Sequence, residues 1–160
     1  MARDSDWFIS ERIRALAIMH LTRRADLIVR EEAREPDKIL DLVVDIIDPA
    51  KPGRRRFGVY LQGTKSPVTI EHANTVLRPS MARFRAYGEV PYPFCLFYFT
   101  MEDNKGYFTW TAEPMIDDEG RPRLRYHEAP HCTEIDREVL DQIVDKVNAW
   151  YDAFYITIKA

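Results

Sequence analysis

A carboxylate, an amide and an ammonium group occur in order along two consecutive strand-like segments of the chain. Asp41 lies in the apolar run 39–47, and Gln62 and Lys65 lie at the end of the run 57–65. Hydrolysis of a phosphodiester at neutral pH needs a metal ion, a nucleophilic water and relief of charge at the phosphate. Mg²⁺ takes hard oxygen ligands, and a lysine can neutralise the developing charge. These residue types therefore match the layout of a metal-dependent nuclease.

The apolar patterning places these residues in a single mixed α/β domain over residues 1–160, with helices packed against a central sheet. We expect helices over 7–24, from Pro79 until Gly88, and after Thr133, which we expect to cap the last helix. We expect strands at 27–29, 39–47, 57–62, 94–100, 107–111 and 122–127, and either a strand or a helix within 68–77. The near-continuous apolar run 39–47 favours a central strand, and a turn at 49–53 joins it to the next strand.

Several side chains outside this trio are expected to be buried. The first helix is apolar on two opposite stripes, so we expect it to be well buried and Glu11 to point inwards. His20 falls on the main stripe, which is more typical of a core histidine than of a ligand. Cys95 lies in an apolar strand, which favours a buried free thiol. The aromatic residues between 94 and 110 are most simply core.

Composition narrows the classes of function. The net charge of −3 argues against a globally basic nucleic-acid coat. No apolar run approaches the roughly 20 residues that span a bilayer, and the polar N-terminus does not resemble a signal peptide, so we expect a cytoplasmic protein. Positive charge is concentrated locally, because Arg54, Arg55 and Arg56 follow the turn, and such a cluster can bind nucleic-acid phosphates. A solvated surface is the alternative interpretation.

Several short motifs follow one another along residues 8–115. They are Glu11 in the first helix, Leu40-Asp41-Leu42 after Pro36-Asp37-Lys38, Tyr60-Leu61-Gln62-Gly63-Thr64-Lys65-Ser66, Tyr92-Pro93-Phe94-Cys95-Leu96 and Gly106-Tyr107-Phe108-Thr109-Trp110. This order resembles the family of uncharacterised domains numbered 4365, which belongs to the PD-(D/E)XK nuclease-like superfamily. The resemblance implies a restriction-endonuclease-like fold with a mixed central sheet flanked by helices.

The same resemblance implies roles for individual residues. Asp41 would be the principal metal ligand, and Gln62 would replace the second acid as a ligand. Lys65 would be the catalytic lysine, and Glu11 would complete the site. The implied cofactor is Mg²⁺ or Mn²⁺, and the implied substrate is DNA or RNA.

One departure from the family pattern concerns the spacing of Gln62 and Lys65. The pattern puts the amide and the lysine two residues apart, which places them on one face of a strand. Here they are three apart, and Thr64 holds the expected position of the lysine. A bulge at Gly63 would restore the geometry, because glycine readily takes the positive φ that a bulge can require. In a regular strand Lys65 points away.

Two other functions stay open beside an active nuclease. A catalytically degenerate module of the same fold would bind nucleic acid through Arg54, Arg55 and Arg56, or act as an accessory subunit in a bacterial defence or mobile-element system. A protein-interaction domain would need no nucleic acid, and the acidic net charge is compatible with it. Many proteins of this fold dimerise, so a homodimer fits each alternative.

Overall fold

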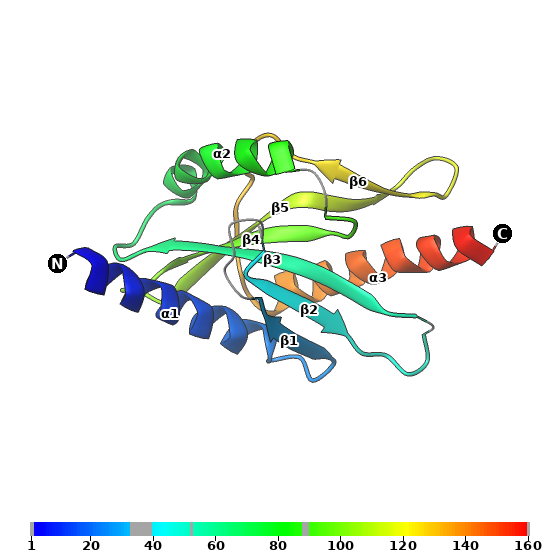
Figure 1. Ribbon diagram of the computed structural model, residues 1–160, viewed down its shortest axis with the longest axis horizontal. Helices are drawn as coiled ribbons and strands as arrows, with labels where there is room; N and C mark the ends of the chain where they lie inside the picture. Colours follow the sequence, from blue (N-terminus) through cyan, green and yellow to red (C-terminus); the bar gives the residue numbers. More distant parts are fainter. Residues whose placement is uncertain (1, 33–39, 52, 88–89, 160) are drawn as a thin grey trace.

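The computed structural model describes residues 2–32, 40–51, 53–87 and 90–159 (Figure 1). Within them, three helices flank an open mixed sheet of seven strands, which confirms the predicted α/β class. The elements are α1 (Ala2–Leu21), β1 (Leu27–Glu31), β2 (Leu42–Ile46), β3 (Arg55–Thr64), α2 (Ile70–Tyr87), β4 (Phe94–Thr100), β5 (Lys105–Ile116), β6 (Pro122–Tyr126), β7 (Thr133–Glu134) and α3 (Arg137–Lys159). The predicted features at 36–39, 52 and 88 lie outside the described residues.

The sheet is antiparallel except at its centre. The strand order is β1-β2-β3-β4-β5-β6, and β7 pairs with β5. Strands β3 and β4 are parallel, because the chain between them passes through helix α2 and returns in the same direction. Strand β3 therefore lies between an antiparallel neighbour, β2, and a parallel one, β4.

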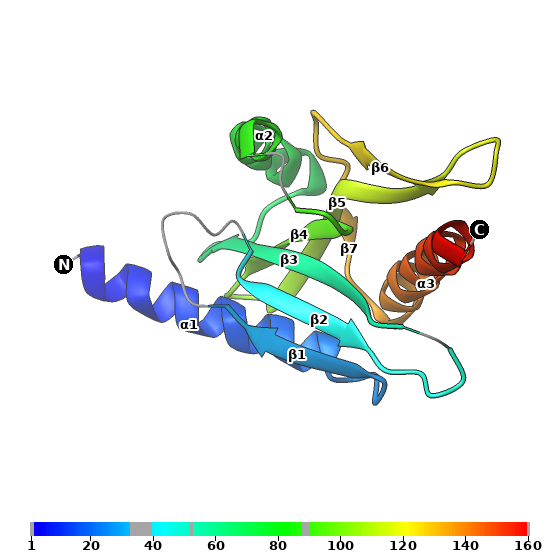
Figure 2. The same ribbon diagram turned by 45° about the vertical axis from the view of Figure 1, so that its right-hand side comes forward.

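The helices form a layer on each face of the sheet, as the two views in Figures 1 and 2 show. Helices α1 and α3 lie on one face, where Leu16 and Ile143 belong to the same core cluster as Val59 of β3. Helix α2 lies on the other face, where Leu77 belongs to a second cluster with Leu96 of β4. No helix in the described part of the chain is long and apolar enough to cross a membrane.

Helix α1 has one buried face instead of the two that its apolar stripes predict. From Ser10 onwards its buried residues are Ile13, Leu16, Ala17, His20 and Leu21. Met19 and Glu11 are exposed, so the prediction of an inward-facing Glu11 is wrong. The cause is that α1 packs on the outside of the sheet, which covers only one of its sides. His20 is the core histidine that we expected, since its ring stacks on Phe99 and burial lowers its pKa.

All three helices begin at other residues than predicted. Helix α1 spans Ala2–Leu21 instead of the predicted 7–24. Helix α2 begins at Ile70, after Thr69, whose Oγ1 accepts a hydrogen bond from His72 N at 3.1 Å. The segment 68–77 is therefore mainly helical, and Pro79 lies inside the helix instead of starting it. Helix α3 is capped by Asp136, whose Oδ1 accepts from Val139 N at 2.8 Å, while the predicted cap Thr133 pairs in β7.

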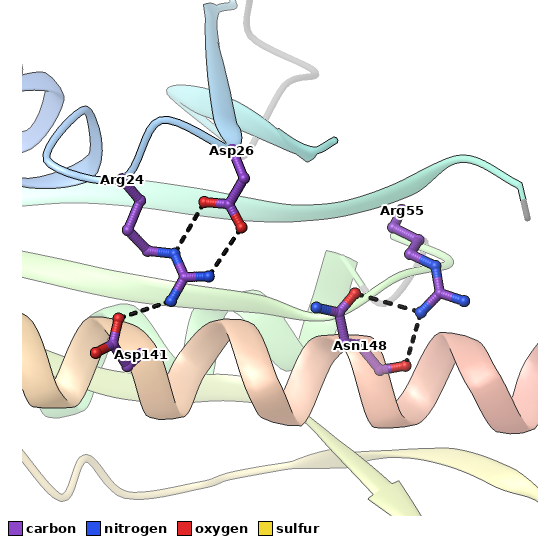
Figure 3. Close-up of polar contacts among 5 residues, drawn as sticks. All are labelled: Arg24, Asp26, Arg55, Asp141 and Asn148. Carbon is purple, nitrogen blue, oxygen red and sulfur yellow. Dashed lines mark hydrogen bonds and ion pairs between the residues drawn. The ribbon is translucent and has the colours of Figure 1, made fainter. Parts of the chain in front are cut away.

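Buried and half-buried arginines attach helix α3 to the sheet (Figure 3). Arg24, just before β1, forms a two-bond pair with Asp26 and reaches Asp141 of α3 at 2.6 Å. Arg55, at the start of β3, donates to the Asn148 backbone oxygen at 3.0 Å. These contacts fix the position of α3 along the sheet at two points of the helix, Asp141 and Asn148.

A third attachment of α3 is a carboxylate held between two basic side chains. Glu113 of β5 bonds His127 Nε2 at 2.6 Å and accepts a hydrogen bond from Lys146 of α3. Burial alone would raise the pKa of Glu113, but the bonds from Lys146 and His127 outweigh burial and lower it. A carboxylate with a lowered pKa stabilises the fold above its unfolded-state pKa, and this contribution disappears as the pH falls through the folded-state pKa.

We therefore expect the stability of Glu113→Gln to fall less than that of the wild type when the pH is lowered. The wild-type chain should exceed the variant in Tm at neutral pH, and the gap should close over the acid range, as the pH falls through the lowered pKa and the carboxylate becomes protonated. Thermal unfolding followed by circular dichroism across this range tests it, with the exposed Glu102→Gln as the matched control. A gap that stays constant with pH would contradict the assignment.

Candidate functional site

Asp41 lies immediately before β2 and is buried at the junction of β2 and β3. Its backbone N–H donates to Val59 O at 3.0 Å, and its carboxylate Oδ2 accepts from Leu61 N at 2.8 Å. The side chain thus provides the acceptor for Leu61 at the point where the paired part of β2 begins. Asp41 has a structural role here, because a buried N–H without an acceptor costs about 1–3 kcal/mol.

Strand β3 stays regular through Gly63. Residues 58–64 pair with 94–100 of β4 in unbroken parallel register, and Gly63 does not have a positive φ. The bulge that would bring Gln62 and Lys65 onto one face is therefore not formed. Glycine is required here for another reason, since a Cβ would lie 2.5 Å from Phe99 O and 2.6 Å from Ile13 Cδ1.

The residues predicted to form one catalytic site are only partly brought together. Gln62 follows Leu61, so it lies next to the Asp41 carboxylate along β3. Lys65 lies past the end of β3 in an exposed bend, and Glu11 is exposed on α1. Because Gly63 faces α1, Gln62 and Thr64 point to the α2 side of the sheet, which α1 does not cover.

A cavity of about 660 Å³ lies where β3 ends and α2 begins. Hydroxyl and apolar groups line it, and its described lining residues include Thr64, Ser66, Thr69, His72 and Tyr98 but no carboxylate. In the described part of the chain, no group of three or more histidine, cysteine, aspartate or glutamate side chains could hold a metal ion. The described lining of the cavity therefore supplies no second carboxylate that could join Asp41 and Gln62 as a Mg²⁺ ligand.

The arginine triplet divides between the two faces of the sheet. Arg55 is 2% exposed and pairs with Asp152 of α3 at 2.7 Å, so it is inaccessible to a ligand and the prediction that it binds nucleic acid is wrong. Arg54 and Arg56 point to the opposite face, where both approach Asp45 of β2. The division follows from the alternation of side chains along a strand.

Arg54 and Arg56 belong to a larger group, which we call the arginine cluster: Arg30, Asp45, Arg54, Arg56 and Tyr92. Arg30 bonds Asp45 Oδ2 at 2.9 Å, whereas Arg54 and Arg56 approach the carboxylate only to 3.7 Å. The arginine side chains are 45%, 60% and 23% exposed in chain order, against 12% for Asp45. Three guanidinium groups therefore surround one carboxylate and remain accessible.

The ring of Tyr92 packs between the guanidinium group of Arg56 and the core. The Arg56 guanidinium carbon lies over the Tyr92 ring at 5.8 Å from its centroid, within the range of a cation–π contact. Burial raises the pKa of the Tyr92 hydroxyl, and the neighbouring Arg56 opposes that rise. Sequence patterns alone did not place Arg30, Asp45 and Tyr92 beside the arginine triplet, although the two-residue spacing of Arg54 and Arg56 was a usable signal.

Comparison of the chain with protein-family models, curated proteins and solved structures finds no match. The resemblance to the PD-(D/E)XK superfamily accordingly rests on the quoted motifs alone.

We expect Gly63→Ala to destabilise the protein, because the added methyl meets a backbone oxygen that cannot move aside. Overpacking of this kind costs about 1–3 kcal/mol, or a Tm lower by roughly 2–10 °C at this chain length. Differential scanning calorimetry measures the change, and the exposed Ser66→Ala serves as the control. A variant as stable as the wild type would mean that β3 departs from regular geometry at Gly63.

For Asp41 we expect the two standard substitutions to differ. Asparagine keeps a side-chain oxygen for the Leu61 N–H, whereas alanine leaves that donor unpaired and should cost about 1–3 kcal/mol more. Urea unfolding of Asp41→Asn and Asp41→Ala gives the difference directly. Equal stability of the two variants would refute the structural role of the carboxylate.

Proposed function

We propose that the chain is a nucleic-acid-binding module of nuclease-like fold that holds phosphates with arginines instead of cleaving them through a metal. The observation that carries the proposal is the arginine cluster, where three arginines whose side chains are 23–60% exposed converge on a single carboxylate. Arginine is well suited to phosphate, because its five N–H donors form a planar fork that matches two phosphate oxygens.

The distances within the cluster support binding of an external anion. Among the basic residues that the structure describes, only Arg30 lies within hydrogen-bond distance of Asp45, and Asp45 Oδ1 accepts no hydrogen bond from the described residues. The nearest side-chain nitrogens of Arg54 and Arg56 lie 3.7 Å from the Asp45 carboxylate oxygens. At that distance the charges attract, but no hydrogen bond forms. Both guanidinium groups therefore keep donors for a ligand, while the carboxylate limits their mutual repulsion.

The geometry around Asp41 favours this function over metal-dependent cleavage. One carboxylate oxygen bonds Leu61 N, Lys65 lies in a bend after β3, and the neighbouring cavity has no acid among its described lining residues. A nuclease would need a metal ligand, a second oxygen donor and a cation on the same face. The nuclease alternative predicts cleavage in Mg²⁺ or Mn²⁺ that Asp41→Asn abolishes, so the two functions are separable.

We expect the purified chain to bind fluorescein-labelled oligonucleotides, with affinity that falls as salt is raised from about 50 to 200 mM. Arg54→Ala combined with Arg56→Ala should weaken binding on the order of 10- to 100-fold and make the slope of log K against log salt shallower by about 0.7–0.9 per arginine. Fluorescence anisotropy measures both quantities.

The matched control is Arg121→Ala, which removes one equally exposed arginine from the β5–β6 turn, where it pairs with Glu119. It should bind as the wild type does, and so should Asp41→Asn. Wild-type affinity in the double arginine variant would exclude the cluster as the interface. Metal-dependent cleavage that is lost in Asp41→Asn would replace the proposal with an active nuclease.

A further inference from the structure

We infer that the nucleic acid held by the arginine cluster is single-stranded, with one unstacked base lying on the Arg56 guanidinium. The inference rests on the proposed function, because it specifies the ligand of the same surface. Two features carry it: the support of Arg56 by Tyr92, and an exposed apolar side chain beside the cluster.

The first feature is the Arg56 guanidinium, which rests on the ring of Tyr92. Tyr92 lies between Pro91 and Pro93, and Pro93 disfavours the helical conformation for the residue before it. Its ring packs against both core clusters, and the following residue is anchored by Gly58 N donating to Pro93 O at 2.9 Å. Arg56, over this fixed ring, keeps 23% of its side chain exposed. A base stacked there would complete a layer of ring, guanidinium and base.

The second feature is Ile28 of β1. It is the register partner of Asp45, and with Arg30 two residues further along β1 it flanks the cluster on the same face. Its side chain is 52% exposed although it lies in a strand. The outer surface of a duplex presents mainly phosphates and sugars, so the flat apolar face of a base is not available there to Ile28. An unstacked base offers both an apolar face and a nearby phosphate.

Both features are useful only to a ligand whose bases are accessible. In a duplex the bases are stacked and paired, so a stacking surface cannot reach them without extrusion of a nucleotide. Single strands expose their bases, and proteins bind them by combining a positive surface with stacking groups. Arg30 and Arg54 supply positive charge for the phosphates. The flat guanidinium of Arg56, held on Tyr92, supplies the surface on which a base can stack. DNA and RNA share this chemistry.

The test compares four labelled probes on the full chain: oligothymidine, oligouridine, an abasic strand of the same length and a duplex. We expect at least one base-containing single strand to bind on the order of tenfold tighter than the abasic strand and tighter than the duplex. Arg56→Lys keeps the charge but loses the plane, so it should abolish this preference and retain the salt slope. Tyr92→Leu should reduce the preference in the same direction.

The outcomes separate the inference from the proposed function. Duplex binding as tight as single-strand binding, or a preference that survives Arg56→Lys, overturns the inference and leaves the arginine interface standing. Absence of salt-dependent binding to all four probes overturns the proposed function itself. Arg121→Lys is the control, because it changes the same atoms outside the cluster, and circular dichroism establishes that Tyr92→Leu is folded.

Discussion

The alternation of side chains along β3 is the constraint on which the rest of the structure depends. Strand β3 is ten residues long and lies between β2 and β4. Phe57, Val59 and Leu61 face the layer of α1 and α3, so the residues between them face the side of α2. The same alternation sends Arg55 to α3, sends Arg56 to the opposite face and puts Gly63 beneath α1.

Arg55 makes this register costly to change. Taking a guanidinium out of water carries a penalty of several kcal/mol, which partners must offset. Asp152 and the Asn148 carbonyl do so, although Arg55 Nε has no hydrogen-bond partner among the described residues. A slip of β3 by one residue would turn the apolar face of the strand outwards and move Arg55 away from both partners. The contacts of the buried arginine with Asp152 and Asn148 are therefore available only in the register observed.

The fold class could be predicted because long segments with clear periodicity dominate the chain. Individual element boundaries could not, because local signals compete with tertiary packing. Pro79 suggested a helix start, yet Thr69 caps the helix earlier, and the helix continues through the proline on an exposed side. Asp136 prevails over Thr133 as the cap of α3 because Thr133 is drawn into pairing with Phe108.

The site was predictable in part for the same physical reason. The arginine triplet was visible in the sequence, and strand alternation applied to it would have separated Arg55 from its two neighbours. Arg30 and Tyr92 could not be assigned, because their places depend on the pairing of β1 with β2 and on the chain that enters β4. Gly63 was identified as critical, but its function is close packing against Phe99 and Ile13.

Asp45 is one of two carboxylates next to β3, the other being Asp41. It explains how a protein with a net negative charge can group three arginines on one face. Donors of the protein itself engage both carboxylates. Asp41 accepts from Leu61 N, and Asp45 lies among three arginines. Screening limits charge interactions to about 8–10 Å at physiological salt, so the phosphate that we propose to bind here would respond to the local excess of guanidinium groups. The overall charge of −3 is spread over the whole chain and has little influence there. Asp45 thus offsets part of the repulsion among three like charges on one face, and a single negative charge leaves a net positive charge there.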